Sequence, residues 1–110
     1  MTLALASSAF VGCVALAGPA SADAVLSPDE VNFIGAVAPQ GYSGDVYATV
    51  RAGHQVCSLL DQGLTHVAIE RFVVDTFGDR RQNADYYAAL FSQYAAYHLC
   101  PRHIGEFGDI

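Results

Sequence analysis

Histidine and tyrosine residues beside two cysteines are the part of this chain whose types and spacing most suggest chemistry. One histidine lies three positions before Cys57, and two tyrosines and a second histidine lie within six positions before Cys100. Imidazole binds haem iron, zinc and copper, and phenolate binds haem iron. These residues would suit a carrier of haem, a metal or a small apolar ligand. The candidate ligand-binding residues are His54, Tyr94, Tyr97 and His98.

The same residues have a simpler structural interpretation. A histidine on an amphipathic helix is well suited to the boundary between surface and core, and tyrosines fill a small core with their hydroxyls at its rim. On this interpretation the chain holds no cofactor and no metal. We take this as the main prediction and the ligand carrier as the alternative.

The sequence gives no sign of a catalytic site. It contains no G-x-S-x-G, no H-E-x-x-H and no glycine-rich phosphate-binding motif. Ser43, Ser58 and Ser92 have no recognisable base or acid beside them in the sequence. We therefore expect no enzyme activity and name no catalytic residue.

The cysteines indicate a disulfide in an exported protein. Cys57 and Cys100 lack the C-x-x-C spacing of redox-active or metal-binding pairs, and in an oxidising compartment such a pair forms a structural bridge. Cys13 lies in the N-terminal apolar run. Because residues 10–13 faintly resemble the site at which lipoproteins are cut and acylated, lipidation of Cys13 is an alternative.

The first 22 residues have the pattern of a secretory signal peptide. An uncharged, mostly apolar run from Leu3 to Ala17 is followed by the small residues of positions 20–22 and then by Asp23, which predicts cleavage between Ala22 and Asp23. The run is shorter than the roughly 20 residues of a membrane span, so an uncleaved anchor is the weaker interpretation. No Lys or Arg precedes the run, so either the amino terminus supplies the charge or the start lies upstream.

The predicted mature chain, residues 23–110, is acidic. The formal net charge is −6, and a chain of this sign is unsuited to nucleic acid or anionic lipid, which bind clusters of cations. The adjacent Arg80 and Arg81 lie between Asp79 and Asp85 and are predicted to form a solvated loop. We expect a secreted or cell-envelope protein without stable membrane insertion, and an unknown protein as the partner. The oligomeric state is open.

Helical periodicity predicts a single all-α domain. Ser27, Pro28 and Glu30 form a capping pattern at the first helix, and further helices are expected at 44–62, from Thr65 to Gly78, and from 83 to 100. The core is expected to span 27–101, and 102–110 to form a mobile tail. The predicted fold is a small four-helix bundle stapled by one disulfide, with a fifth helix in the tail as the alternative.

The short connections predict how the helices are arranged. Successive helices joined by short loops run antiparallel, so the second and fourth helices would be parallel neighbours joined by the disulfide. A disulfide brings helices closer than their usual spacing, which requires small residues near the contact. Gly53 and Ala96, each four positions before a cysteine, are expected to face each other.

Four tyrosines near predicted helix starts favour an interaction surface. They are too many for all to be buried in so small a domain, and exposed tyrosines are typical of protein interfaces. The favoured function is a noncatalytic interaction protein of the cell envelope or the extracellular space. The tyrosines are Tyr42, Tyr47, Tyr86 and Tyr87, of which the last two are the pair to mutate.

Three short motifs carry a resemblance to a known family. They are a helical G-x-x-V-C at 53–57, an L-x-x-G helix exit at 60–63, and the closing Cys100-Pro101. In this order behind a signal peptide, they resemble the small secreted actinobacterial, mainly mycobacterial, proteins catalogued as domain of unknown function 732. The resemblance covers residues 27–101 and implies an exported, disulfide-stapled helical fold. It implies no activity, and Leu99 stands where members often have an aromatic residue.

Overall fold

The computed structural model describes residues 25–107 and is all-α in that part. The predicted fold class is therefore confirmed. The predicted signal peptide, its cleavage site at Ala22 and Asp23, Cys13 and residues 108–110 lie outside the described residues. The elements, in order, are α3 (Pro28–Val37), η3 (Ala38–Gln40), α4 (Val46–Asp61), α5 (His66–Phe77), α6 (Ala84–Leu99) and η4 (Pro101–Phe107), where η denotes a 3-10 helix.

Most helix ends lie where the capping residues predict. The Ser27 hydroxyl accepts a hydrogen bond from the Glu30 N–H, and the Glu30 carboxylate accepts one from the Ser27 N–H, which completes the capping box at α3. The Thr65 hydroxyl caps α5. Helix α4 begins later than expected because Asp45, rather than an earlier residue, accepts hydrogen bonds from its first turn.

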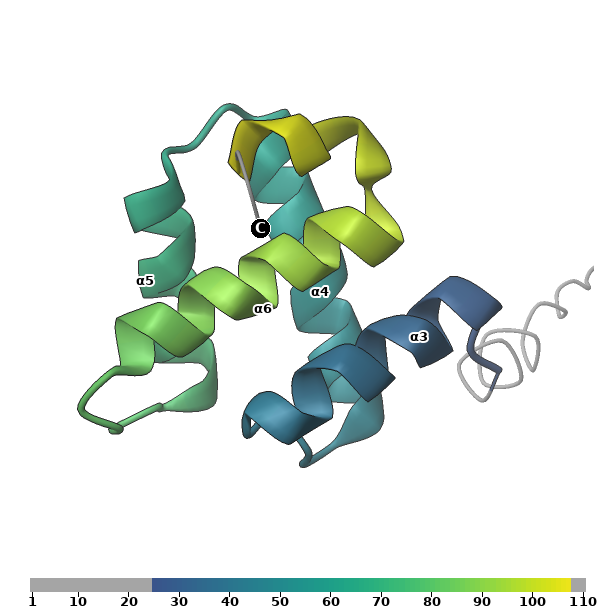
Figure 1. The fold of residues 1–110 in the computed structure, drawn as a ribbon, viewed down its shortest axis with the longest axis horizontal. Helices are drawn as coiled ribbons and strands as arrows, with labels where there is room; N and C mark the ends of the chain where they lie inside the picture. Colours follow the sequence, from purple (N-terminus) through teal and green to yellow (C-terminus); the bar gives the residue numbers. More distant parts are fainter. Residues whose placement is uncertain (1–24, 108–110) are drawn as a thin grey trace, which may run out of the picture.

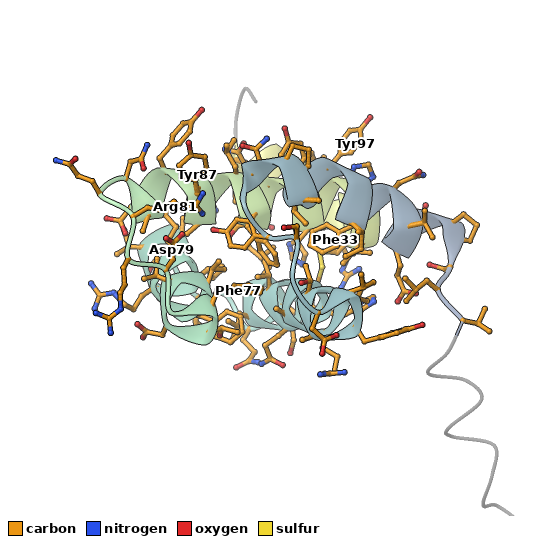
Figure 2. The ribbon with its side chains drawn as sticks, turned by 90° about the horizontal axis from the view of Figure 1, so that it is seen from below. Phe33, Phe77, Asp79, Arg81, Tyr87 and Tyr97 are labelled. Atoms are coloured by element: carbon orange, nitrogen blue, oxygen red, sulfur yellow. A yellow bond between two sulfur atoms is a disulfide. The ribbon has the colours of Figure 1, made fainter. Side chains whose placement is uncertain are left out.

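The four α-helices form two crossed layers. Helices α3 and α6 run antiparallel in one layer, and α4 and α5 run antiparallel in the other (Figures 1 and 2). Helix α6 therefore crosses α4 instead of running alongside it (Figure 1). The prediction of parallel α4 and α6 was wrong, because short loops fix the direction of successive helices but not the angle between layers.

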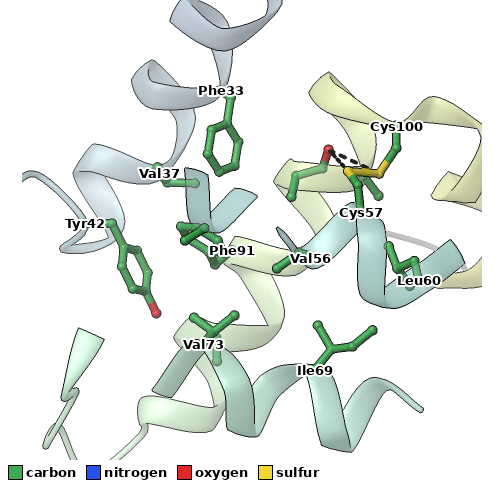
Figure 3. Close-up of a cluster of buried hydrophobic side chains, with 14 residues drawn as sticks. Phe33, Val37, Tyr42, Val56, Cys57, Leu60, Ile69, Val73, Phe91 and Cys100 are labelled. Atoms are coloured by element: carbon green, nitrogen blue, oxygen red, sulfur yellow. Dashed lines mark hydrogen bonds between the residues drawn. A yellow bond between two sulfur atoms is a disulfide. The ribbon is translucent and has the colours of Figure 1, made fainter. Parts of the chain in front are cut away.

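The hydrophobic core fills the space between the layers (Figure 3). Its centre is Phe91 of α6, whose ring lies 5.2 Å from Phe33, 4.9 Å from Tyr42 and 5.3 Å from Phe77 by centroid distance. Edge-on ring contacts of this kind stabilise a core beyond the apolar area that they bury. The remaining fully buried large side chains come from all four helices, among them Val37, Val56, Ile69 and Val73.

A disulfide joins Cys57 of α4 to Cys100 at the end of α6, as predicted, with a Cα–Cα distance of 6.0 Å. Gly53, one turn before Cys57, is buried. A Cβ atom at Gly53 would lie 2.7 Å from the Phe33 ring and 2.8 Å from Leu99. The atoms nearest to that position thus belong to Phe33 and Leu99 and not to Ala96, since crossing helices bring in a neighbour from α3.

Residues 101–107 form η4, where the sequence predicts the start of a mobile tail. Arg102 donates two hydrogen bonds at 2.9 Å to the Asp61 carboxylate, and His103 Nε2 lies 2.6 Å from Asp61 Oδ1. His103 Nδ1 also hydrogen-bonds Glu106, and the Phe107 ring stacks on His66 at 4.4 Å. Asp61 and His66 lie on α4 and α5, so no local pattern in the tail revealed these two partners, whereas Glu106 lies in η4 three positions after His103.

The same contacts account for Asp61, a carboxylate at the C-terminal end of a helix, where the dipole disfavours negative charge. Hydrogen bonds from His103 and Arg102 lower the pKa of Asp61 below its ordinary value. Hydrogen bonds to Asp61 and Glu106 raise the pKa of His103.

Across residues 25–107, no helix combines the length and the apolar character that crossing a bilayer requires.

Candidate functional site

His54 of α4 lies on the surface and is paired with α3. Its Nε2 atom is 2.7 Å from Glu30 Oε2, and its side chain is 51% exposed. The hydrogen bond from the Ser27 backbone and then that from His54 lower the pKa of Glu30. A shallow pocket of about 190 Å³ adjoins this pair and is lined by Val25, Leu26, Glu30, Tyr47, Val50, Arg51 and His54.

The other candidate ligand-binding residues lie on α6. Tyr94 is half-buried against the core, whereas Tyr97 is 60% exposed and its ring lies 4.8 Å from that of His98. Among the described residues no hydrogen bond or ion pair joins His54 to these three. Nor does the described part of the chain bring three or more His, Cys, Asp or Glu side chains together for a metal ion. The ligand-binding role of the four residues stays a prediction.

A larger pocket lies at the end of the molecule where two loops meet. Its volume is about 470 Å³, and it opens between the turn after η3 and the loop that joins α5 to α6. It is lined by Gly41, Tyr42, Gly44, Phe77, Gly78, Asp79, Arg80 and Arg81. We call this site the loop pocket.

Arg81 joins the two loops that form the loop pocket. Its guanidinium donates to both oxygens of Asp79, at 2.7 to 3.2 Å, and to the Gln40 carbonyl at 2.7 Å. It also lies 3.9 Å from the centre of the Tyr87 ring, a cation–π contact (Figure 2). Gly41 has a φ of 103°, which favours glycine, and a Cβ there would lie 2.6 Å from Arg81 Nη1, so a larger residue would displace the guanidinium.

Arg81 and Asp79 form an ion pair. Hydrogen bonds from Arg81 lower the pKa of Asp79, and the same pairing raises the pKa of Arg81. The Asp79 side chain is 6% exposed, so its carboxylate faces Arg81 and not the solvent. The pair is therefore a structural connection between loops, and it leaves little free charge in the pocket.

Tyr42 forms a wall of the loop pocket and part of the core. It is 4% exposed, and its ring centre lies 4.9 Å from that of Phe77. Burial, followed by the negative charge of Asp79, raises the pKa of Tyr42 to about 12, so the phenol is neutral at physiological pH. Its hydroxyl is buried without a hydrogen-bond partner among the described residues. A buried donor in this state costs about 1–3 kcal/mol.

Arg80 and Arg81 are both exposed, but Arg80 differs from its neighbour because it makes no ion pair with any described residue. The prediction that the two arginines lie in a solvated loop is therefore confirmed, although Arg81 is also paired with Asp79. The spacing of Asp79 and Arg81, two positions apart after a loop glycine, was the signal available in the sequence. The long-range partners of Arg81, which are Gln40 and Tyr87, carried no such signal.

The four tyrosines named from the sequence have different environments. Tyr42 is buried, because η3 turns the chain back so that the ring enters the core, and this agrees with the expectation that not all four could be buried. Tyr47 is 42% exposed and Tyr86 is 59% exposed. Tyr87 is half-buried and contacts both Arg81 and Tyr86. Mutation of Tyr87 would therefore disturb the loop connection as well as any binding surface.

Comparison with known proteins gives one match. The sequence model of a family described as "Protein of unknown function (DUF732)" matches residues 28–102, from the start of α3 to the start of η4. No curated protein and no solved structure matches the chain. The matched range contains the disulfide, the core and the loop pocket.

Proposed function

Because the chain belongs to the DUF732 family, whose function is unknown, we propose its role from its own surface. We propose that it is a noncatalytic, extracytoplasmic interaction domain. Its binding surface is the outer face of α6, and its partner is a protein that presents an apolar, uncharged surface. The observation that carries this proposal is an uncharged helix face with exposed tyrosines at both ends.

Helix α6 is unusual because its outer face lacks charged residues. Its inner face carries the buried Ala88, Phe91 and Ala95. The opposite side presents Tyr86, Leu90, Gln93 and Tyr97, spaced by four, three and four positions. No charged residue occurs from Tyr86 to Tyr97. A helix that is apolar all round is normally covered by other protein.

The exposed tyrosines suit this surface to protein binding. Tyr86 is 59% exposed and Tyr97 is 60% exposed, and Tyr97 points away from the core (Figure 2). Tyrosine is enriched in interfaces, whereas charged residues are depleted from their centres. In a chain of net charge −6, an uncharged face is the surface at which association avoids electrostatic repulsion.

Two features support the extracytoplasmic location. The Cys57–Cys100 disulfide is buried at Cys100, and structural disulfides are typical of oxidising compartments. The N-terminal 22 residues have the signal-peptide pattern described above. Together they favour export and folding outside the cytoplasm.

The test combines site-specific photocrosslinking with two matched variants. A photoreactive phenylalanine at position 93, in the middle of the face, is expected to crosslink one partner, which mass spectrometry identifies. Tyr86→Ser with Tyr97→Ser should abolish that crosslink while the far-UV helical signal persists. Val67→Ser, which removes a still more exposed apolar side chain from α5, should leave it intact.

The outcome also separates two kinds of partner. A crosslinked dimer of this chain would show that a second copy covers the face, and multi-angle light scattering would then report a dimer that the double variant loses. A monomer whose position 93 gives no crosslink in envelope extracts would refute the proposal. Equal crosslinking by the wild type and the double variant would refute it as well.

A further inference from the structure

We infer that the loop pocket is a second, separate binding site, for a small carboxylate attached to an apolar group. This inference goes beyond the proposed function, since the pocket lies between loops 41–45 and 78–83 and not on the outer face of α6. It rests on three observations: the size and lining of the pocket, an unpaired arginine at its edge, and a buried hydroxyl that lacks an acceptor.

The pocket has room for a compact ligand with an apolar part. Its volume of about 470 Å³ falls in the range of about 300–1,000 Å³ typical of small-molecule sites. The rings of Phe77 and Tyr42, 4.9 Å apart, give it an apolar wall. Three of its lining residues are the glycines Gly41, Gly44 and Gly78, which place backbone rather than side chains at the opening.

The one charge at the pocket that no ion pair with a described residue neutralises is positive. Arg81 and Asp79 neutralise each other through two hydrogen-bonded oxygens, and the Asp79 carboxylate is nearly inaccessible. Arg80 lines the same pocket, is exposed, and has no ion-pair partner in the described part of the chain. In an acidic protein this guanidinium is available to an external anion, and a planar carboxylate matches its paired N–H donors.

The Tyr42 hydroxyl adds a donor that lacks an acceptor. A phenol that is 4% exposed and without a partner is a rare arrangement, because buried polar groups are almost always satisfied. The buried hydroxyl can donate only to an acceptor that enters the pocket as far as the Tyr42 ring, whereas the exposed Arg80 guanidinium donates at the edge of the pocket, beside the apolar wall. That combination selects an acceptor with negative charge on an apolar body, which is the chemistry of an arylalkyl carboxylate.

Two sources supply such a group: the carboxyl end of a peptide with an aromatic or aliphatic last residue, and a free organic acid. Both have the same recognition chemistry. A cation is disfavoured because the accessible charge of the pocket is that of Arg80. A multiply charged phosphate is a poor match for a single unpaired arginine beside an apolar wall.

The experiment is a titration of the oxidised, exported protein followed by two-dimensional NMR of its backbone amides. The probe is phenylacetate, and phenylacetamide is its neutral counterpart. We expect saturable shifts with phenylacetate at Gly41, Gly44 and Gly78, and affinity at least about fivefold weaker for the amide. This factor is modest because Arg80 is exposed and its ion pair is screened by solvent.

Three variants test whether phenylacetate binds in the loop pocket. Arg80→Gln should weaken phenylacetate binding at least about fivefold. Arg71→Gln, the same change at an exposed arginine of α5 outside the pocket, should leave it unchanged. Tyr42→Phe, which keeps the ring and removes the hydroxyl, should also weaken binding. Equal affinity for the acid and the amide, equal loss in the two arginine variants, or no saturable shift would each overturn the inference.

A second pair of probes distinguishes the two sources. A pentapeptide ending in phenylalanine is compared with the same peptide carrying a carboxyl-terminal amide. Tighter binding of the free peptide than of phenylacetate supports a peptide end as the natural ligand. Binding of phenylacetate without binding of either peptide supports a free acid. Neither result depends on the α6 crosslink, so this inference and the proposed function stand or fall separately.

Discussion

The packing at Gly53 predicts that glycine-to-alanine substitution changes the stability of the protein in opposite directions at two helical positions, 53 and 35. A Cβ at Gly53 would lie 2.7 Å from the buried Phe33 ring, whereas a Cβ at Gly35 of α3 has no neighbouring atom within 4 Å. Phe33 is fully buried and packs on Phe91, so its ring has no space into which to retreat. Glycine-to-alanine substitution should therefore be destabilising at position 53 and stabilising at position 35.

The magnitudes follow from two opposing effects. Alanine in place of glycine in a helix stabilises by about 0.5–1 kcal/mol through backbone entropy. Overpacking a filled core costs about 1–3 kcal/mol. Gly35→Ala should thus raise the free energy of unfolding by about 0.5–1 kcal/mol, and Gly53→Ala should lower it by up to about 2 kcal/mol. The difference between the variants isolates the overpacking.

Urea unfolding of the oxidised protein, followed by far-UV circular dichroism, measures both variants on one scale. In a domain of this size a change of 1 kcal/mol moves the melting temperature by about 4–8 °C, so thermal unfolding gives a second reading. If Gly53→Ala stabilises the protein as much as Gly35→Ala does, Phe33 does not pack against α4 as described, and the crossed arrangement of the layers is wrong.

Three further predictions concern the hydroxyl, the histidine and the disulfide. Without ligand, Tyr42→Phe should raise the free energy of unfolding in urea by about 1 kcal/mol, because it removes a buried donor without an acceptor; a loss of stability would mean that the hydroxyl is satisfied. Asp61 and Glu106 raise the pKa of His103, so its stabilising effect should be complete below its ordinary value of 6.5 and be lost as the pH rises through the higher folded value. Urea unfolding of the wild type and His103→Gln at several pH values tests this, and identical pH profiles would contradict it. Replacing both cysteines by serine removes a cross-link between residues 43 positions apart and should cost about 4 kcal/mol at 25 °C, whereas a loss below about 1 kcal/mol in urea unfolding would refute the stabilising role.

Local signals in the sequence predicted the helices but not their packing. The capping box at Ser27 and Glu30, the cap at Thr65 and the helix stop at Gly78 each depend on residues within four positions, and the structure has all three. The cysteine pair was predictable because only two cysteines follow the signal pattern. The angle between the layers depends on which side chains interlock across the core, and the contact of Phe33 with Gly53 carries no local signal.

The loop pocket was missed for a related reason. Its polar residues come from two loops about 40 positions apart, and the hydrogen bond from Arg81 to Gln40 spans 41 positions. In the sequence, Arg80 and Arg81 are equivalent members of a charged turn. Only the fold distinguishes them, because it gives Arg81 a carboxylate, a carbonyl and an aromatic ring as partners and leaves Arg80 without an ion pair among the described residues.

The placement of Asp61 one turn after Cys57 links the docking of η4 to oxidation. Once Cys57 and Cys100 are bonded, Arg102 and His103 are held within a few residues of Asp61, and their effective concentration around the carboxylate rises steeply. In the reduced chain the same side chains must find Asp61 across a separation of 41 residues or more. The disulfide therefore favours the docking of η4, and we expect the carboxyl-terminal segment to be better protected from proteases in the oxidised protein than in the reduced one.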